Sequence, residues 1–307
     1  MKKVLTHILI SACLLPTVVG STACSDQDEN EIEVPEEKPE VKPEGGSFEI
    51  PPEVIDKVHE VYAGATLGPQ KVTSVNQLAI LTSICALHQG EGPITVTAAT
   101  LNGEDITLLM LGGTQEVEGQ ATTMEENQLA SFGKPNDYLT AVVKLFTDGT
   151  IPSQKPVLVT GISLGGMIAQ QLLGQSEVVD HFTLRAVITY GSPITLPLDR
   201  KGCTVVRFAD EHDMVPKLGE TILRSGLLTG TQMSRKELMQ KLEELDAQER
   251  IVRAGKYTEM IETHALSYIE DECWGDVDFL GDPAKKNKLE LKETMKFYQA
   301  PKLTEKK

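Results

Sequence analysis

The segment Gly161-Ile162-Ser163-Leu164-Gly165 places one serine between two glycines with the spacing G-x-S-x-G. An apolar run at residues 157–160 precedes it and another at residues 167–173 follows it, which predicts a strand, a tight turn and a helix. In such a turn the serine adopts a strained conformation, and the first amides of the helix can stabilise developing negative charge. The pattern therefore predicts that Ser163 is a nucleophile.

A glycine-rich turn between a strand and a helix has two other interpretations, a simple connection or a phosphate-binding loop. A phosphate site favours nearby basic side chains, but no Lys or Arg lies between Lys155 and Arg185. The nucleophile is therefore the favoured interpretation, and the simple turn stays open as the alternative.

A nucleophilic serine needs a base, and the base needs a carboxylate to orient it. Where the serine follows this kind of turn, the acid comes next along the chain and the histidine last. Three histidines follow Ser163. His181 comes too early to leave room for an acid on a later strand, and His212 is adjacent to the acid candidates. Order and elimination therefore predict His264 as the base.

The acid is expected just after the predicted strand at residues 203–208. Asp210, Glu211 and Asp213 all follow that strand. Open α/β sheets build their sites at the carboxyl ends of their strands, which is where these three side chains would lie. Their positions in the sequence do not decide among them.

The elements that must position these residues alternate between strands and helices. Apolar β-rich runs predict strands at residues 94–101, 106–111, 157–160, 184–190 and 203–208, the first two joined by the hairpin signal Asn102-Gly103. Apolar periodicity predicts helices at residues 52–62, 74–87, 137–146, 167–173 and 234–252, and a polar loop is expected at residues 115–134. We therefore expect an α/β fold with a mostly parallel sheet and helices on both faces.

Three segments together resemble the class 3 (fungal-type) lipases of the α/β-hydrolase fold: residues 157–167, Tyr190-Gly191-Ser192-Pro193 and residues 206–216. The resemblance extends over about residues 75–270. Its D-x-V-P motif matches Asp213-Met214-Val215-Pro216, which makes Asp213 the implied acid and Asp210 the fallback. The family histidine matches His264. The resemblance also implies an oxyanion hole formed by the backbone amides of Thr114 and Leu164.

The resemblance implies a serine hydrolase that cleaves small-molecule or lipid carboxylic esters through an acyl-enzyme, with no cofactor. Ile162 and Gly112 stand where the family usually has His and Arg, which leaves the substrate class open. One alternative is a carbohydrate esterase that removes acetyl or feruloyl groups. Another is a non-catalytic surface binding protein built on a hydrolase fold. Residues 115–134 and the segment between Asp213 and His264 are the candidate lids.

The N-terminal residues have the pattern of an export signal. Lys2 and Lys3 precede an apolar stretch at residues 4–20, so residues 1–23 are expected to be a signal peptide. Residues 21–24 resemble a bacterial lipobox, which implies lipidation of Cys24; an ordinary signal peptide with an incidental cysteine is the alternative. Residues 25–46 hold nine acidic residues and three prolines. We therefore expect residues 24–46 to be a disordered tether and residues 47–307 to be the folded domain.

Residues 25–29 are acidic and resemble the surface-export signal of lipoproteins from the Bacteroidetes. The expected location is therefore the outer membrane or cell surface, with the protein attached to the membrane through the lipid on Cys24. The 307-residue chain has a formal net charge of −16 and a pI of about 4.9, which argues against nucleic-acid binding. The chain contains no CxxC or HExxH spacing, so the sequence gives no support for a metal site.

Overall fold

A computed structural model of the protein describes residues 52–88, 90–195, 200–217, 250–270, 274–282 and 286–303. The predicted signal peptide and tether lie outside the described residues, as does nearly all of the predicted helix at residues 234–252. Most of the segment between Asp213 and His264, one of the two candidate lids, also lies outside them.

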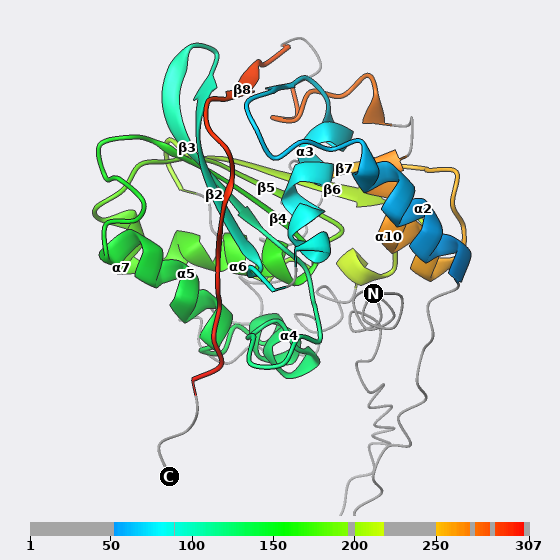
Figure 1. Cartoon of the computed structure of the whole chain (residues 1–307), viewed down its shortest axis with the longest axis horizontal. Helices are drawn as coiled ribbons and strands as arrows, with labels where there is room; N and C mark the ends of the chain where they lie inside the picture. Colours follow the sequence, from blue (N-terminus) through cyan, green and yellow to red (C-terminus); the bar gives the residue numbers. More distant parts are fainter. Residues whose placement is uncertain are drawn as a thin grey trace, which may run out of the picture.

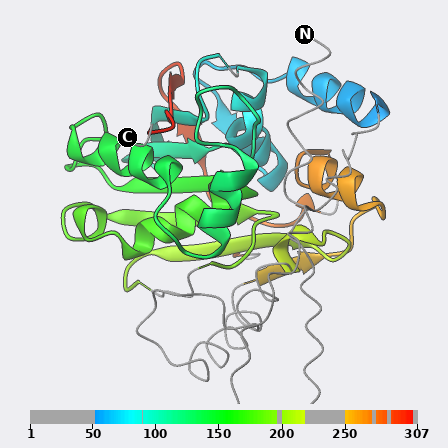
Figure 2. The same cartoon turned by 90° about the horizontal axis from the view of Figure 1, so that it is seen from below.

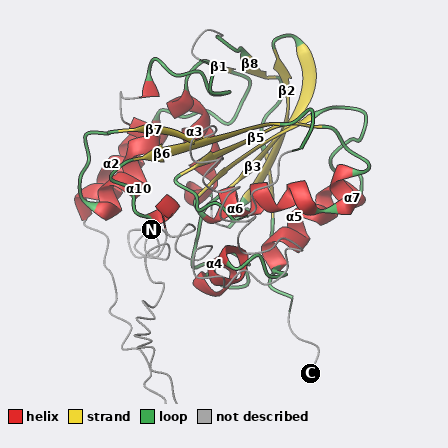
Figure 3. Ribbon diagram, turned by 180° about the vertical axis from the view of Figure 1, so that it is seen from behind, coloured by secondary structure: helices red, strands yellow, loops and turns green. Residues whose placement is uncertain are grey.

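The described strands form one mixed sheet, seen edge-on between helices in Figure 3. The spatial order is β1-β8-β2-β3-β4-β5-β6-β7, with β9 also paired to β2. Strands β3 to β7 are parallel, and the pairs on the β2 side are antiparallel. The strands are β1 (Lys71–Val72), β2 (Ile94–Leu101), β3 (Glu104–Leu111), β4 (Val157–Ile162), β5 (Leu184–Tyr190), β6 (Thr204–Asp210), β7 (Arg250–Arg253), β8 (Leu289–Leu291) and β9 (Lys296–Tyr298).

Helices cover both faces of the sheet, which confirms the predicted α/β class (Figure 1). One face carries α2 (Pro52–Ala63), α3 (Val75–Ser83) with the 3-10 helix η1 (Ile84–Leu87), and α10 (Met260–Glu270). The other carries α4 (Met124–Ser131), α5 (Asp137–Thr147), α6 (Leu164–Gln171) with η2 (Leu172–Gly174), and α7 (Ser176–Val179). Figure 2 shows α2 and α10 together at one side of the molecule.

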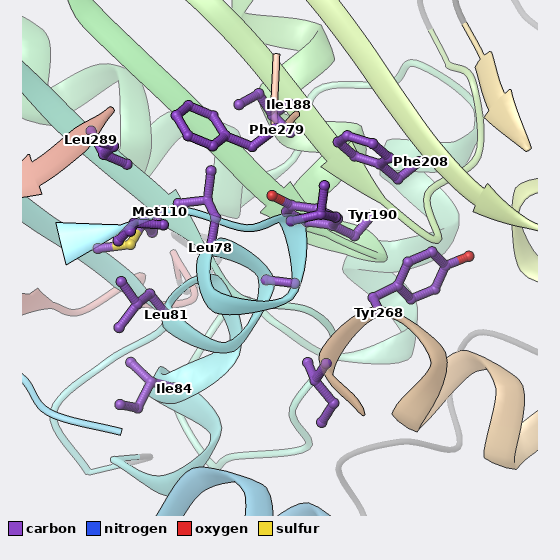
Figure 4. Packing of buried hydrophobic residues seen from close by; sticks show 14 of the residues in the cluster. Leu78, Leu81, Ile84, Met110, Ile188, Tyr190, Phe208, Tyr268, Phe279 and Leu289 are labelled. Atoms are coloured by element: carbon purple, nitrogen blue, oxygen red, sulfur yellow. The ribbon is translucent and has the colours of Figure 1, made fainter. Parts of the chain in front are cut away.

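Alternate residues of the central strands enter two separate cores. In β3, Leu108 and Met110 belong to the core under α3 and α10, whereas Leu109 and Leu111 belong to the core under α5 and α6. A strand with both faces covered has to be apolar at consecutive positions, because its side chains alternate between the faces. Figure 4 shows the first core, where Leu78 of α3 lies among side chains of several strands.

The hairpin between β2 and β3 forms as predicted, with Asn102 at φ 54° and Gly103 at φ 87°. A two-residue turn with positive φ at both positions matches the twist of the strands it joins, which is why Asn-Gly is favoured there.

Two predicted elements are wrong in part. Residues 250–252, expected to end a long helix, belong to β7, where Ile251 and Val252 pair with β6. Both are β-branched, and pairing to an open sheet edge outweighs the helical pattern that precedes them. The polar segment expected as a loop at residues 115–134 contains α4, whose first turn carries Glu125 and Glu126. Acidic side chains in the first turn stabilise a helix, because they interact favourably with the positive end of its dipole.

The core under α3 gives a stability prediction. Leu78 is fully buried, so Leu78→Ala should lower the free energy of unfolding by about 2–5 kcal/mol in urea denaturation. The matched control is Leu303→Ala, because Leu303 is 59% exposed and its truncation should cost less than about 0.5 kcal/mol. Equal losses for both variants would contradict the placement of Leu78.

Candidate active site

Ser163 lies in the turn between β4 and α6 in a conformation that residues other than glycine rarely adopt. Its backbone has φ 52° and ψ −121°, and its amide donates a hydrogen bond to the carbonyl of Tyr190 at 2.9 Å. Such strain persists only where the surrounding structure imposes it, and it is frequent at functional sites. The predicted strand, turn and helix are therefore present, and the turn holds the serine in a strained backbone conformation.

Close backbone packing explains why glycines flank the serine. A Cβ on Gly161 would lie 2.3 Å from the carbonyl oxygen of Gly165, and a Cβ on Gly165 would lie 2.2 Å from that of Leu111. Both distances are far shorter than any real contact of a Cβ atom. The start of α6 therefore packs against the ends of β3 and β4 at a distance that only glycine allows.

The residues predicted as an oxyanion hole lie beside this turn. Leu164 is the first residue of α6, so its amide is one of the helix N–H groups without an intrahelical acceptor. The loop after β3 is close by, because a Cβ on Gly113 would lie 3.4 Å from the Cβ of Ser163. Thr114 follows in that loop and is 5% exposed.

A side chain that the sequence analysis did not identify orients Thr114. Asn127 of α4 donates from Nδ2 to Oγ1 of Thr114 at 2.8 Å. A hydroxyl that accepts such a bond keeps its own proton available for a second acceptor. Asn127 is 13 residues away in a segment expected to be a loop, and no local signal indicated the contact.

Asp213 and His264 form a buried hydrogen-bonded pair. Nδ1 of His264 lies 2.9 Å from Oδ2 of Asp213, and the two residues are 5% and 0% exposed. Oδ1 of Asp213 accepts the amide of Val215 at 2.9 Å, which fixes the carboxylate plane. Since Nδ1 faces the carboxylate, Nε2 is the nitrogen that remains to accept a proton.

Gly191 makes room for this pair at the end of β5. It has φ +53°, and a Cβ there would lie 2.9 Å from Oδ2 of Asp213 and 3.2 Å from Cε1 of His264. Loops after β3, β4, β5 and β6 thus contribute Thr114, Ser163, Gly191 and Asp213. These strands are neighbours and parallel, so the four loops meet at one edge of the sheet.

The alternative acid, Asp210, is buried but has different partners. Its Oδ2 accepts the hydroxyl of Ser267, its Oδ1 accepts the amide of His212 at 2.9 Å, and Nδ1 of His212 lies 3.3 Å from the same Oδ1. The geometry therefore pairs His264 with Asp213 and not with Asp210.

Tyr268, which the sequence analysis also missed, connects the two carboxylate residues. Its hydroxyl donates to Oδ2 of Asp213 at 2.8 Å and accepts the amide of Asp210 at 3.0 Å. Burial, and then the charge of Asp213, hold the pKa of Tyr268 well above its usual range, so the phenol stays a donor. The sequence signal that could have indicated this role is helical spacing. Tyr268 follows His264 by four residues on α10, so the two side chains lie on the same face of the helix.

Ser163 and His264 line one pocket that contains about 600 Å³ of empty space, including its open mouth. The helices α2, α3–η1 and α10 and the loop after β3 form its walls. Among the described residues, no Lys, Arg, Asp or Glu lines it; the lining is Val58, Tyr62, Ser83, Ala86, Gly113, Thr114, Gln115, Ile162, Ser163, His264 and Ala265.

Cys85 and Cys203 are free thiols, and Cys85 is buried beside the loop after β3, where Gln115 donates to its sulfur at 3.3 Å. Burial raises the pKa of the Cys85 thiol to about 12, which leaves it protonated and unreactive. In the described part of the chain, no three His, Cys, Asp or Glu side chains cluster as metal ligands would.

Comparison of the chain with protein-family models, with curated proteins and with solved structures gives no significant match. Among the residues that the structure describes, no helix has both the length and the apolar character needed to span a membrane.

The network around Asp213 gives a second prediction. Tyr268→Phe should lower the free energy of unfolding by about 1–3 kcal/mol, because it leaves the buried amide of Asp210 and Oδ2 of Asp213 each without one partner. Tyr298→Phe, which removes a hydroxyl from the half-buried β9, is the control and should change stability by less than about 0.5 kcal/mol. Urea denaturation of both variants measures the difference, and a Tyr268→Phe protein as stable as the parent would contradict this role.

Proposed function

We propose that the protein is a serine hydrolase that cleaves carboxylic esters, with Ser163 as nucleophile, His264 as base and Asp213 as the acid that orients it. The observation that carries the proposal is that a serine in a strained turn and the histidine of a buried Asp–His pair line one pocket. This combination of geometry and chain order is typical of the α/β-hydrolases. The sheet of parallel strands β3 to β7 is compatible with that fold, and the class 3 lipase resemblance supports it.

The proposed reaction begins when Oγ of Ser163 attacks the ester carbonyl carbon and Nε2 of His264 takes the hydroxyl proton. Asp213 stabilises the imidazolium through its bond to Nδ1. The carbonyl oxygen becomes an oxyanion, which the amides of Leu164 and Thr114 stabilise. Collapse of this intermediate breaks the ester C–O bond, and His264 returns the proton to the departing alcohol.

The acyl group then remains on Ser163 until water removes it. His264 takes a proton from the water, whose oxygen attacks the acyl carbon, and the same two amides stabilise the second oxyanion. The carboxylic acid leaves and the proton returns to Ser163. Each step uses only groups that line the pocket or support it, and none requires a cofactor.

Export is a separate proposal that rests on the sequence of residues 1–46. We propose that Cys24 carries a lipid that holds the enzyme at a membrane surface, with residues 25–46 as a spacer. The acidic, proline-containing composition of the spacer favours an extended chain, which would keep the pocket away from the anchor.

The nucleophile is tested by Ser163→Ala. This variant should lose ester hydrolysis and labelling by a fluorophosphonate probe, because both need Oγ of Ser163. Its melting temperature should stay equal or rise, since alanine removes one polar group from a strained site. Ser176→Ala on the outer helix α7 is the control and should keep both activities. Hydrolysis by Ser163→Ala within tenfold of the parent would contradict the proposal, and a parent protein that neither hydrolyses esters nor reacts with the probe would favour a binding role.

The acid is tested by the isosteric pair Asp213→Asn and Asp210→Asn, assayed on one short-chain ester. Asp213→Asn should lower kcat by about 10⁴-fold, the loss known for the equivalent change in a serine protease, because the imidazole loses its orienting charge. Asp210→Asn should cost far less, since Asp210 contacts Ser267 and His212 and not His264. A larger loss for Asp210→Asn would show that the acid is assigned wrongly.

A further inference from the structure

The pocket that contains Ser163 takes part of its wall from α2, a helix near the start of the described chain. Val58 and Tyr62 of α2 line the pocket, together with Ala86 of η1 and Ala265 of α10. Val58 and Tyr62 are one helical turn apart on the buried face of α2 and are each 6% exposed. The proposed reaction chemistry does not use either residue, so their contribution to the pocket is otherwise unexplained.

The chemistry of this wall suits an uncharged apolar group. The described lining contains no Lys, Arg, Asp or Glu, and His264 is the only histidine in it. Burial raises the pKa of Tyr62, so this phenol stays neutral. A charged substituent would lose its hydration here without gaining an ionic partner, whereas an aliphatic chain would gain from burial.

We propose that α2 forms the acyl-binding wall of the enzyme, with Val58 and Tyr62 setting the length of the aliphatic acyl group that the pocket accepts. This inference rests on the proposed hydrolase function. The occupant is assigned as the acyl group because that part of the substrate is present in the site during both half-reactions, whereas the alcohol leaves after the first. The substrates are therefore esters of uncharged aliphatic acids.

Two valines on α2 provide a matched test. Val54 and Val58 are four residues apart and both buried, at 0% and 6% exposure, but only Val58 lines the pocket. Val54→Ala and Val58→Ala remove the same two methyl groups from the same helix. A loss of packing is common to both variants, so a change in chain-length preference that appears only in Val58→Ala reports on the pocket.

The measurement is kcat/KM for 4-nitrophenyl esters from acetate to dodecanoate. In the parent, each added methylene that is buried should raise kcat/KM about fourfold until the chain meets α2. Val58→Ala should move that maximum to longer chains and raise the octanoate-to-butanoate ratio at least about fivefold. Ala86→Leu, which narrows the pocket from η1, should move the maximum to shorter chains, and Val54→Ala should leave it unchanged.

A second substrate series, acetate esters of alcohols from ethanol to octanol, tests whether the acyl group or the alcohol of the substrate contacts α2. Preference along this series should not change in Val58→Ala or Ala86→Leu; a change there without one in the acyl series would overturn the assignment to the acyl group. Equal shifts in Val54→Ala and Val58→Ala would show that the effect is general packing.

Different results would contradict the role of α2 and the proposed hydrolase function. If the parent cleaves the esters, Ser163→Ala does not, and neither Val58→Ala nor Ala86→Leu changes the chain-length profile, the hydrolase stands and the role of α2 is wrong. If the parent cleaves no ester in either series, the proposed function is wrong and the acyl wall is wrong with it.

Discussion

The close approach of the N-terminus of α6 to the ends of β3 and β4 is the constraint on which the candidate site depends. Gly161 and Gly165 permit it, because a Cβ at either position would overlap a backbone atom. Ser163 has a positive φ at this approach, and the start of α6 lies next to the loop after β3. A rigid sheet can impose this local strain since its parallel strands are buried on both faces. The packing of the two cores thus helps to offset the energetic cost of the turn.

Helix α10 supplies side chains that contact both buried carboxylates, those of Asp213 and Asp210. On α10, His264 and Tyr268 contact Asp213, and Ser267 contacts Asp210, so residues at spacings of three and four converge on one loop. The same helix packs on α2 and α3 (Figure 2). Displacement of α10 would therefore alter the proposed base, the proposed acid and the pocket wall together. A phenol at position 268 thus fills core space and also donates to Asp213, which an apolar side chain of the same size would not do.

Much of this organisation could be predicted from local sequence. The turn around Ser163, the Asn102-Gly103 hairpin and the buried strands depend on patterns within about ten residues, and the structure has them. His264 was found by elimination and Asp213 by resemblance, and the structure pairs them. The contacts of Asn127 with Thr114 and of Tyr268 with Asp213 were missed because they depend on how separate elements dock. Strand β7 was missed since pairing with β6, and not its own pattern, decides its conformation.

The C-terminal strands have a consequence for the order in which the chain can complete its fold. Strands β8 and β9 pair with the same edge of β2: β8 pairs with Ala99–Leu101, and β9 pairs with Ile94–Val96. Nearly 200 residues separate these partners, so that edge has open hydrogen-bonding groups throughout synthesis of the intervening chain. An unpaired strand edge invites pairing with other chains, and long-range pairing of this kind is slow. The parallel strands that position the candidate site can associate before β8 and β9 are synthesised. The hydrogen bonding of the antiparallel side is complete only after these two strands have paired with β2.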